Sequence, residues 1–243
     1  MKSDQHKEST TLQNLQGQNL PTGLRACRWT LILSAGLTIL NLGLFDFAPS
    51  IFTSLIDTLQ YDRAAVGQGE VWRLMTGNFM HWSAAHFLLD IGAFLVLGVI
   101  YERYFGRAYL PILTATTATV GVCVHLFSPE MTTYRGLSGV DSGLFAAILC
   151  VEAILACRDR IRWIWAAPAI IVFTVKIAYE SITGQLFFET QSLGDLGIPT
   201  AMAHLSGAIA GVTAIVLILV QANRKPTADR RRTLMQSVAS DRG

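Results

Sequence analysis

Six long apolar stretches, separated by short polar ones, cover most of the chain. They lie at residues 29–46, 84–104, 108–127, 138–157, 161–180 and 200–221. About 20 consecutive apolar residues form a helix long enough to cross the hydrocarbon core of a bilayer. The pattern therefore predicts an all-α membrane protein with six transmembrane helices, the fifth of which contains the helix-bending Pro168.

Composition supports the membrane assignment. The 243 residues are 51% hydrophobic and only 15% charged, and the mean hydropathy is +0.42. Soluble domains carry about a quarter charged residues. The net charge of +2 gives no reason to expect a nucleic-acid partner. The lipid bilayer is the expected partner surface, and no feature of the sequence indicates an oligomeric state.

Basic residues predict the orientation. Fifteen of the 19 Lys and Arg residues lie in the two tails and in the loops after the second and fourth spans. The opposite side holds only Arg63, Arg73 and Arg135, and Lys176 lies within the fifth span. Because cytoplasmic loops are rich in Lys and Arg, both termini are expected to be cytoplasmic in a multi-pass protein of the cell (inner) membrane.

This orientation divides the chain into three parts. We expect a polar cytoplasmic tail over residues 1–24, a six-helix membrane domain over 25–224, and a basic cytoplasmic tail over 225–243. The outer segment 47–83 is long and holds apolar residues at helical spacing. We expect it to fold partly into the outer leaflet.

Several ionisable residues fall within the predicted spans. An Asp or Lys at the centre of a membrane helix costs about +2.5 to +3.5 kcal/mol, so each one needs a partner or a function. The residues are His86, Asp90, His125, Asp141, Glu152, Lys176 and His204, with Glu102 and Glu180 nearer helix ends.

Two of the predicted helices carry faces of small residues. On the fourth, Gly139 and Gly143 are four residues apart, beside Ser138. On the sixth, His204 shares one stripe with Gly207 and Gly211. Small residues let membrane helices approach closely, and contact between the two glycine faces would bring His204 beside Ser138. A serine and a histidine in that arrangement form a nucleophile and its general base.

The position of Ser138 also suits anion stabilisation. It follows Gly136 and Leu137 at the start of the fourth helix. The first N–H groups of a helix have no partner within the helix, and they can stabilise an oxyanion.

With these residues in these positions, the sequence resembles the rhomboid family of intramembrane serine proteases. The resemblance rests on EVWRLMTGNFMHWSAAHFLLD at residues 70–90 followed by YERYFG at 101–106, on GLSG at 136–139, and on AHLSGAIAG at 203–211. It covers residues 29–221 and implies a six-helix rhomboid-like bundle. It also implies cleavage of transmembrane protein substrates in or near their membrane segments, and no cofactor.

The resemblance assigns roles residue by residue. Ser138 matches the nucleophile and His204 the general base of a dyad that requires no third member. His86 matches a histidine that helps to bind the oxyanion, together with the Ser138 backbone N–H. Asp90 and Gly139 are further candidates for the oxyanion and substrate-binding site. Glu102 matches an acidic residue that holds part of the first loop in place.

Asp90 is the first departure from the family pattern. It stands four residues after His86, where the family usually has an asparagine that donates to the oxyanion. An ionised aspartate cannot donate. Either Asp90 is protonated, which burial would favour, or it turns away and orients His86.

Asp141 and Ser142 form the second departure. Many members carry an aromatic residue at the position of Ser142, and some short bacterial members, including the rhombosortase group, carry a histidine. Asp141, one turn from Ser138, is a candidate for orienting His204 as a third triad member. Alternatively it pairs with Lys176. We also expect His125 to hydrogen-bond the segment 47–83.

Three other functions compete with a peptidase. A catalytically inactive rhomboid-like protein that binds membrane-protein clients would not need both Ser138 and His204. A proton-coupled transporter would usually show repeated halves, and the sequence has none. His86 and Asp90 share a helix face, but no HExxH motif is present, so no metal is expected.

Overall fold

A computed structural model of the protein describes residues 27–47, 49–157, 159–185, 187 and 201–224. The chain forms two compact units, one of residues 20–213 and one of residues 1–19 with 214–243. Of the second unit, the structure describes residues 214–224, and all other described residues belong to the first unit. The tails predicted over 1–24 and 225–243 lie outside the described residues.

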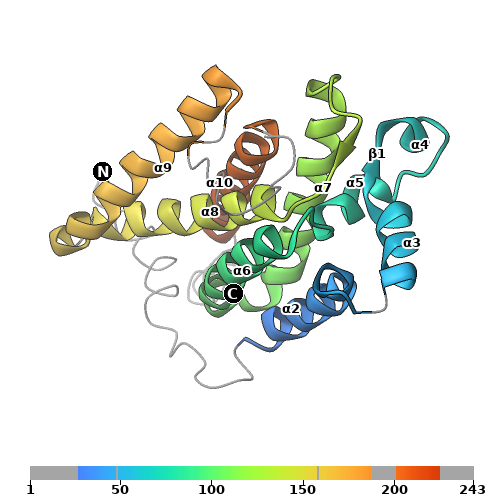
Figure 1. Ribbon diagram of the computed structural model, residues 1–243. Helices are drawn as coiled ribbons and strands as arrows, with labels where there is room; N and C mark the ends of the chain where they lie inside the picture. The colour runs from blue at the N-terminus through green and yellow to red at the C-terminus, as the bar shows by residue number, and fades with distance from the viewer. Residues whose placement is uncertain (1–26, 48, 158, 186, 188–200, 225–243) are drawn as a thin grey trace, which may run out of the picture. The chain divides into compact units, whose positions relative to one another are not determined.

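The described elements are almost all helices (Figure 1). In chain order they are α2 (Arg28–Leu40), η2 (Leu42–Phe45), α3 (Pro49–Leu59), β1 (Tyr61–Asp62), α4 (Arg63–Gly67), α5 (Arg73–Thr76), η3 (Gly77–Phe79), α6 (Ala84–Phe105), η4 (Gly106–Ala108), α7 (Tyr109–Phe127), β2 (Thr133–Tyr134), α8 (Ser138–Ala156), η5 (Arg160–Arg162), α9 (Trp163–Thr183) and α10 (Ala201–Arg224).

Five of the predicted spans are helices of the expected length. Within the described residues, α6, α7, α8, α9 with η5, and α10 are long and apolar enough to cross a membrane. The first predicted span is shorter than expected, because α2 has only 13 residues before the η2 turn. At 1.5 Å per residue, α2 is about 20 Å long, less than the ~30 Å of a typical hydrocarbon core.

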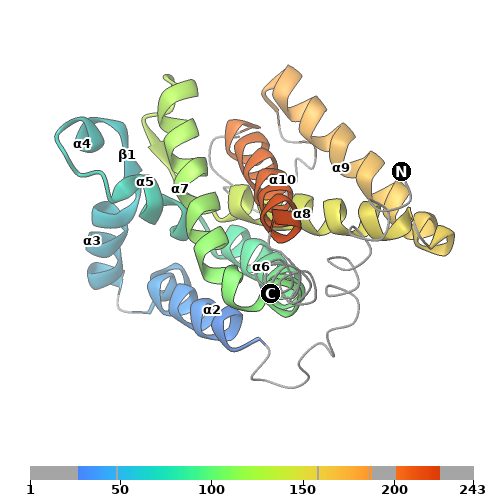
Figure 2. The ribbon, with the colours of Figure 1, turned by 180° about the vertical axis from the view of Figure 1, so that it is seen from behind.

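The long segment between α2 and α6 is folded, as the sequence predicts. In both views α5 lies beside α7, and α3, β1 and α4 lie on the outer side of α5 (Figures 1 and 2). The close contact lies at Gly121 of α7, where a β-carbon would meet the backbone oxygen of Leu74. Arg63 binds the other side of this junction, donating to the backbone oxygens of His125 and Ser128 at 2.8 Å each.

A short β-ladder, which the hydropathy pattern does not predict, ties this segment to the chain just before α8. β1 pairs antiparallel with β2, with Tyr61 opposite Tyr134. The Tyr61 hydroxyl also lies 3.0 Å from His125 Nδ1, so the expected contact between His125 and the segment 47–83 is confirmed.

Glu102 has a different role from the one that the resemblance implies. Its carboxylate accepts hydrogen bonds from the backbone N–H groups of Trp29 and Thr30, at 3.0 and 2.8 Å. The first N–H groups of a helix lack acceptors within the helix, and the Glu102 carboxylate is the acceptor for two of them in α2. It therefore anchors the start of α2 to the end of α6, and among the described residues its hydrogen bonds go to α2 and not to the segment 47–83.

The two glycine faces predicted on α8 and α10 do meet. A β-carbon on Gly207 would lie 1.9 Å from the backbone oxygen of Gly139, and one on Gly211 would lie 2.0 Å from that of Gly143. The helix backbones are in direct contact here, which only glycine allows. This crossing brings the start of α10 to the start of α8.

Candidate active site

A constrained loop leads into α8 and presents Ser138. Gly136 has a φ of +144°, a conformation that residues with a β-carbon rarely adopt. Its backbone oxygen accepts a 2.8 Å hydrogen bond from the Tyr134 hydroxyl. Burial raises the pKa of Tyr134 well above its ordinary value, so this hydroxyl stays protonated and remains a donor.

Ser138 and His204 lie within hydrogen-bonding distance. His204 Nε2, on α10, is 3.0 Å from Ser138 Oγ, on α8. The two residues are 66 positions apart in the chain, and the glycine crossing described above brings them together. An imidazole nitrogen at this distance can take the hydroxyl proton as the oxygen attacks.

The other nitrogen of His204 faces a carboxylate on α9. His204 Nδ1 lies 2.7 Å from Glu180 Oε2, and the Glu180 side chain is only 2% exposed. Lys176, one turn earlier on α9, places its Nζ 2.8 Å from the same oxygen and 3.2 Å from His204 Nδ1. Three helices thus supply a connected chain of polar groups ending at Ser138.

His86 and the start of α8 border the same loop. A β-carbon on Gly136 would lie 3.1 Å from the His86 ring, so the ring packs directly against the glycine. His86 Nδ1 is buried and has no hydrogen-bond partner among the described residues. Among the residues that the structure describes, no side chain caps α8, and the first N–H groups of a helix can donate to an added oxygen.

Asp90 accepts hydrogen bonds around this loop. Its Oδ2 accepts from the backbone N–H of Leu137 at 2.9 Å. It also lies 3.2 Å from His81 Nε2 and 3.3 Å from His86 Nε2. The arrangement matches a carboxylate that orients His86 and the loop before Ser138, the second of the two alternatives raised by the sequence.

Gly139 contributes close packing. A β-carbon there would lie 2.9 Å from Val120 of α7 and 3.0 Å from the backbone oxygen of Ala203 of α10. Gly139, next to Ser138, is therefore fixed by contact with α10, the helix that carries His204.

Asp141 does not contact His204, so the expectation that it orients the base is wrong. Neither of its carboxylate oxygens has a hydrogen-bond partner among the described residues, which also excludes the expected pairing with Lys176. The side chain borders a cavity of about 270 Å³ between α6, α8 and α9, together with Ser142 and Leu97.

Glu180 is the residue that the sequence did not single out. From the sequence, Glu180 is only one of the acidic residues near the ends of the predicted helices. Its spacing from Lys176, four positions earlier on one helix face, predicts a local ion pair. Nothing local shows that the same carboxylate also reaches a histidine 24 positions later.

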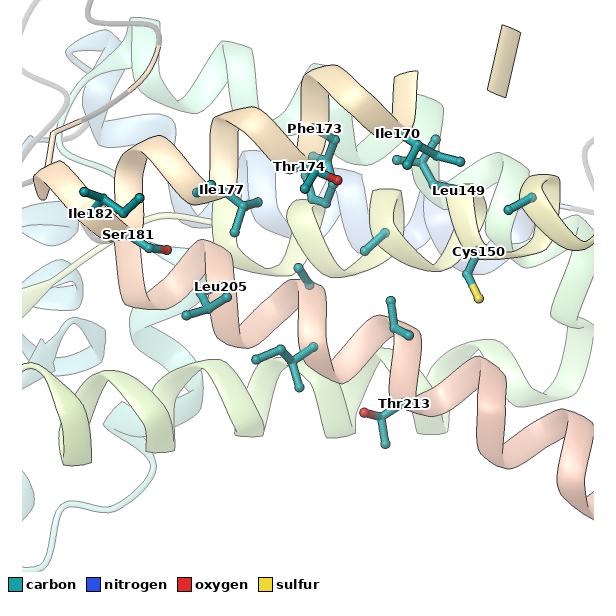
Figure 3. Close-up of a pocket in the computed structure, with 16 residues that line it drawn as sticks. Leu149, Cys150, Ile170, Phe173, Thr174, Ile177, Ser181, Ile182, Leu205 and Thr213 are labelled. Atoms are coloured by element: carbon teal, nitrogen blue, oxygen red, sulfur yellow. The ribbon is translucent and has the colours of Figure 1, made fainter. Parts of the chain in front are cut away.

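An apolar cavity of about 810 Å³ lies beside the polar chain, between α8, α9 and the start of α10 (Figure 3). Leu149, Phe173, Ile177 and Leu205 line it, and Ser181 is one of its few polar groups. Glu180 and His204 each directly precede a lining residue. The side chains of Glu180, His204 and Ser138 are not among its lining residues, but the cavity and these polar groups share the helices α8, α9 and α10.

Comparisons with known proteins agree with this architecture. The Rhomboid domain family matches residues 68–221, more than half of the chain. Rhomboid protease GluP of Bacillus subtilis (strain 168) is 32% identical over 91 residues, which cover 37% of this chain and 18% of that relative. The family match includes α6 to α10 and all the site residues described above, and the chain belongs to the rhomboid family of multi-pass membrane proteins.

Proposed function

We propose that the protein is an intramembrane serine endopeptidase. It cleaves membrane-anchored proteins in or near their transmembrane segments through a Ser138–His204 dyad. The observation that carries the proposal is the 3.0 Å contact between Ser138 Oγ and His204 Nε2. Membership of a family that includes intramembrane proteases supports it.

The dyad can carry out both halves of peptide hydrolysis. Ser138 Oγ attacks the substrate carbonyl carbon while His204 Nε2 takes the hydroxyl proton. The tetrahedral adduct breaks its C–N bond, and His204 gives the proton to the leaving amine. Water, deprotonated by His204, then attacks the Ser138 ester, which releases the acid product and restores the hydroxyl.

The start of α8 and His86 are placed to stabilise the oxyanion of the adduct. The N–H groups of Ser138 and Gly139 belong to the first turn of α8, where helices offer unpaired donors. His86 packs against Gly136, two residues before the nucleophile. The N–H of Leu137 is not available, because Asp90 accepts it.

Apolar surroundings support a membrane substrate. The cavity beside Glu180 and His204 is lined almost entirely by apolar side chains, so it favours an apolar segment over a soluble peptide. We propose that α2 with η2 forms a sixth, short span, that the termini are cytoplasmic, and that the protein lies in the bacterial inner membrane. The excess of Lys and Arg in the tails and in two loops supports this orientation.

A fluorophosphonate probe tests the nucleophile directly. The detergent-purified protein should become covalently labelled, and Ser138→Ala should abolish the labelling. Ser142→Ala is the matched control, because Ser142 is also buried on α8, one turn further on; it should label like the wild type. Labelling that survives Ser138→Ala would rule out this nucleophile. A folded wild-type protein that never labels would favour the inactive, client-binding alternative.

A further inference from the structure

The row of hydrogen-bonded polar groups at the candidate active site continues from Ser138 and His204 to Glu180. Glu180 Oε2 lies 2.7 Å from His204 Nδ1, and His204 Nε2 lies 3.0 Å from Ser138 Oγ. Resting on the function proposed above, we propose that Glu180 is the positioning residue of a Ser138–His204–Glu180 triad. Its carboxylate fixes His204 in the tautomer that can accept the Ser138 proton.

The hydrogen-bonding capacity of each group supports this role. A neutral imidazole has one N–H and one lone pair, whereas an ionised carboxylate only accepts. The short contact with Glu180 therefore requires the proton to be on His204 Nδ1. The lone pair is then on Nε2, which faces the Ser138 hydroxyl and can act as the base.

Lys176 makes the choice of tautomer critical. Its Nζ is 3.2 Å from His204 Nδ1 as well as 2.8 Å from Glu180 Oε2. An ammonium group only donates, so without Glu180 it would donate to Nδ1 and leave the proton on Nε2. That tautomer presents an N–H to Ser138 and cannot take its proton. Glu180 thus has two effects. It orients His204, and it binds the Lys176 ammonium, which would otherwise stabilise the tautomer that is protonated at Nε2.

The carboxylate is held in place from its other side. Glu180 Oε1 accepts a 3.1 Å hydrogen bond from the backbone N–H of Phe187. Gly184, with a φ of +69°, ends α9, and its N–H bonds to the backbone oxygen of Glu180. The chain leaving α9 therefore turns back onto Glu180 and limits the positions that its side chain can take.

The reaction also benefits from a carboxylate here. When His204 takes the Ser138 proton it becomes a cation, only 3.2 Å from the Lys176 ammonium. In a site with little water these two positive charges repel strongly. The negative charge of Glu180 lies against both and reduces the cost of forming the imidazolium.

Glu180→Gln in the full-length protein tests the proposal. The change keeps the shape and removes the charge, so Lys176 is free to donate to His204. We expect the rate of fluorophosphonate labelling to fall by about 100-fold or more, since loss of the carboxylate from a serine triad has large effects of this kind. Glu152→Gln is the control, because Glu152 pairs with Arg162 and Tyr104 and not with the dyad; it should keep the wild-type rate.

A double variant separates the tautomer from general loss of structure. Replacing Lys176 by Met in the Glu180→Gln background removes the competing donor, so labelling should recover at least about tenfold relative to Glu180→Gln alone. A merely structural role predicts no recovery, because a second change in the same network would not repair packing. Wild-type labelling in folded Glu180→Gln, or no recovery in the double variant, would overturn the proposal.

Nitrogen-15 NMR of histidine-labelled protein gives a readout that needs no activity. The wild-type His204 should be protonated at Nδ1 and unprotonated at Nε2, with His204→Asn used to assign its signals. An unprotonated Nδ1 in the wild type would overturn the triad even if Glu180→Gln failed to fold. Failure of the peptidase proposal would appear separately, as an absence of labelling in the wild type with the tautomer unchanged.

Discussion

At the scale of single residues, Asp90 shows how a departure from a family pattern can keep a site intact. An asparagine at this position would offer the oxyanion an N–H donor. Asp90 instead accepts the Leu137 N–H and lies within 3.3 Å of nitrogens of His81 and His86. The acidic residue therefore positions the loop before Ser138 and the ring of His86.

Substitutions at Asp90 should separate shape from charge. An asparagine can place its amide oxygen where Oδ2 lies and still accept from Leu137, so Asp90→Asn should keep fluorophosphonate labelling within about tenfold of the wild type. Asp90→Leu leaves the buried Leu137 N–H unpaired, at a cost of about 1–3 kcal/mol, and should lower both the labelling rate and the unfolding temperature. A folded Asp90→Asn protein without labelling would show instead that the carboxylate charge itself is required.

At the scale of elements, the crossing of α8 and α10 positions the proposed nucleophile Ser138 and its proposed base His204. Gly207 lies three residues after His204 and faces the backbone of Gly139, next to Ser138. The distance between the two reactive side chains therefore depends on how closely these two backbones approach. The sequence predicts this contact because the glycines recur at helical spacing on both helices.

Gly207→Ala should separate the dyad. Its β-carbon would lie 1.9 Å from the backbone oxygen of Gly139, so the helices must move apart and carry His204 away from Ser138. We expect a large loss of labelling and a lower unfolding temperature. Gly92→Ala on α6 is the control, since a β-carbon there meets nothing within 4 Å; it should leave labelling unchanged and stabilise the helix by up to about 1 kcal/mol. Wild-type labelling of Gly207→Ala would contradict this view of the crossing.

At the scale of the whole molecule, the distribution of charge predicts how the chain sits in the bilayer. If α2 with η2 is a sixth span, as proposed above, it and the five spanning-length helices of the described residues make an even number of crossings and place both ends on one side. The side rich in Lys and Arg is expected to be the cytoplasm. The folded segment α3 to η3 would then lie on the outside.

Accessibility of single cysteines in intact cells tests this orientation. The test starts from a variant in which all four native cysteines are replaced, so that each added cysteine is the only one. The native cysteines are Cys27, Cys123, Cys150 and Cys157. An impermeant maleimide should label Gln68→Cys, because Gln68 is exposed after α4. It should label Ser3→Cys and Ser240→Cys only after the cells are broken. Labelling of either tail in intact cells would show that the tail lies outside.

The sequence by itself determined the elements, since a bilayer requires about 20 apolar residues per span and the chain has six such stretches. It also predicted the pairing of Ser138 with His204, because the small-residue faces on the two helices let their backbones approach closely. Only the tertiary structure showed the length of α2 and the β-ladder. It also showed the anchoring of α2 by Glu102, and that Glu180 rather than Asp141 contacts the base. Each of these depends on how one helix is rotated and placed against another, and hydropathy does not encode that rotation.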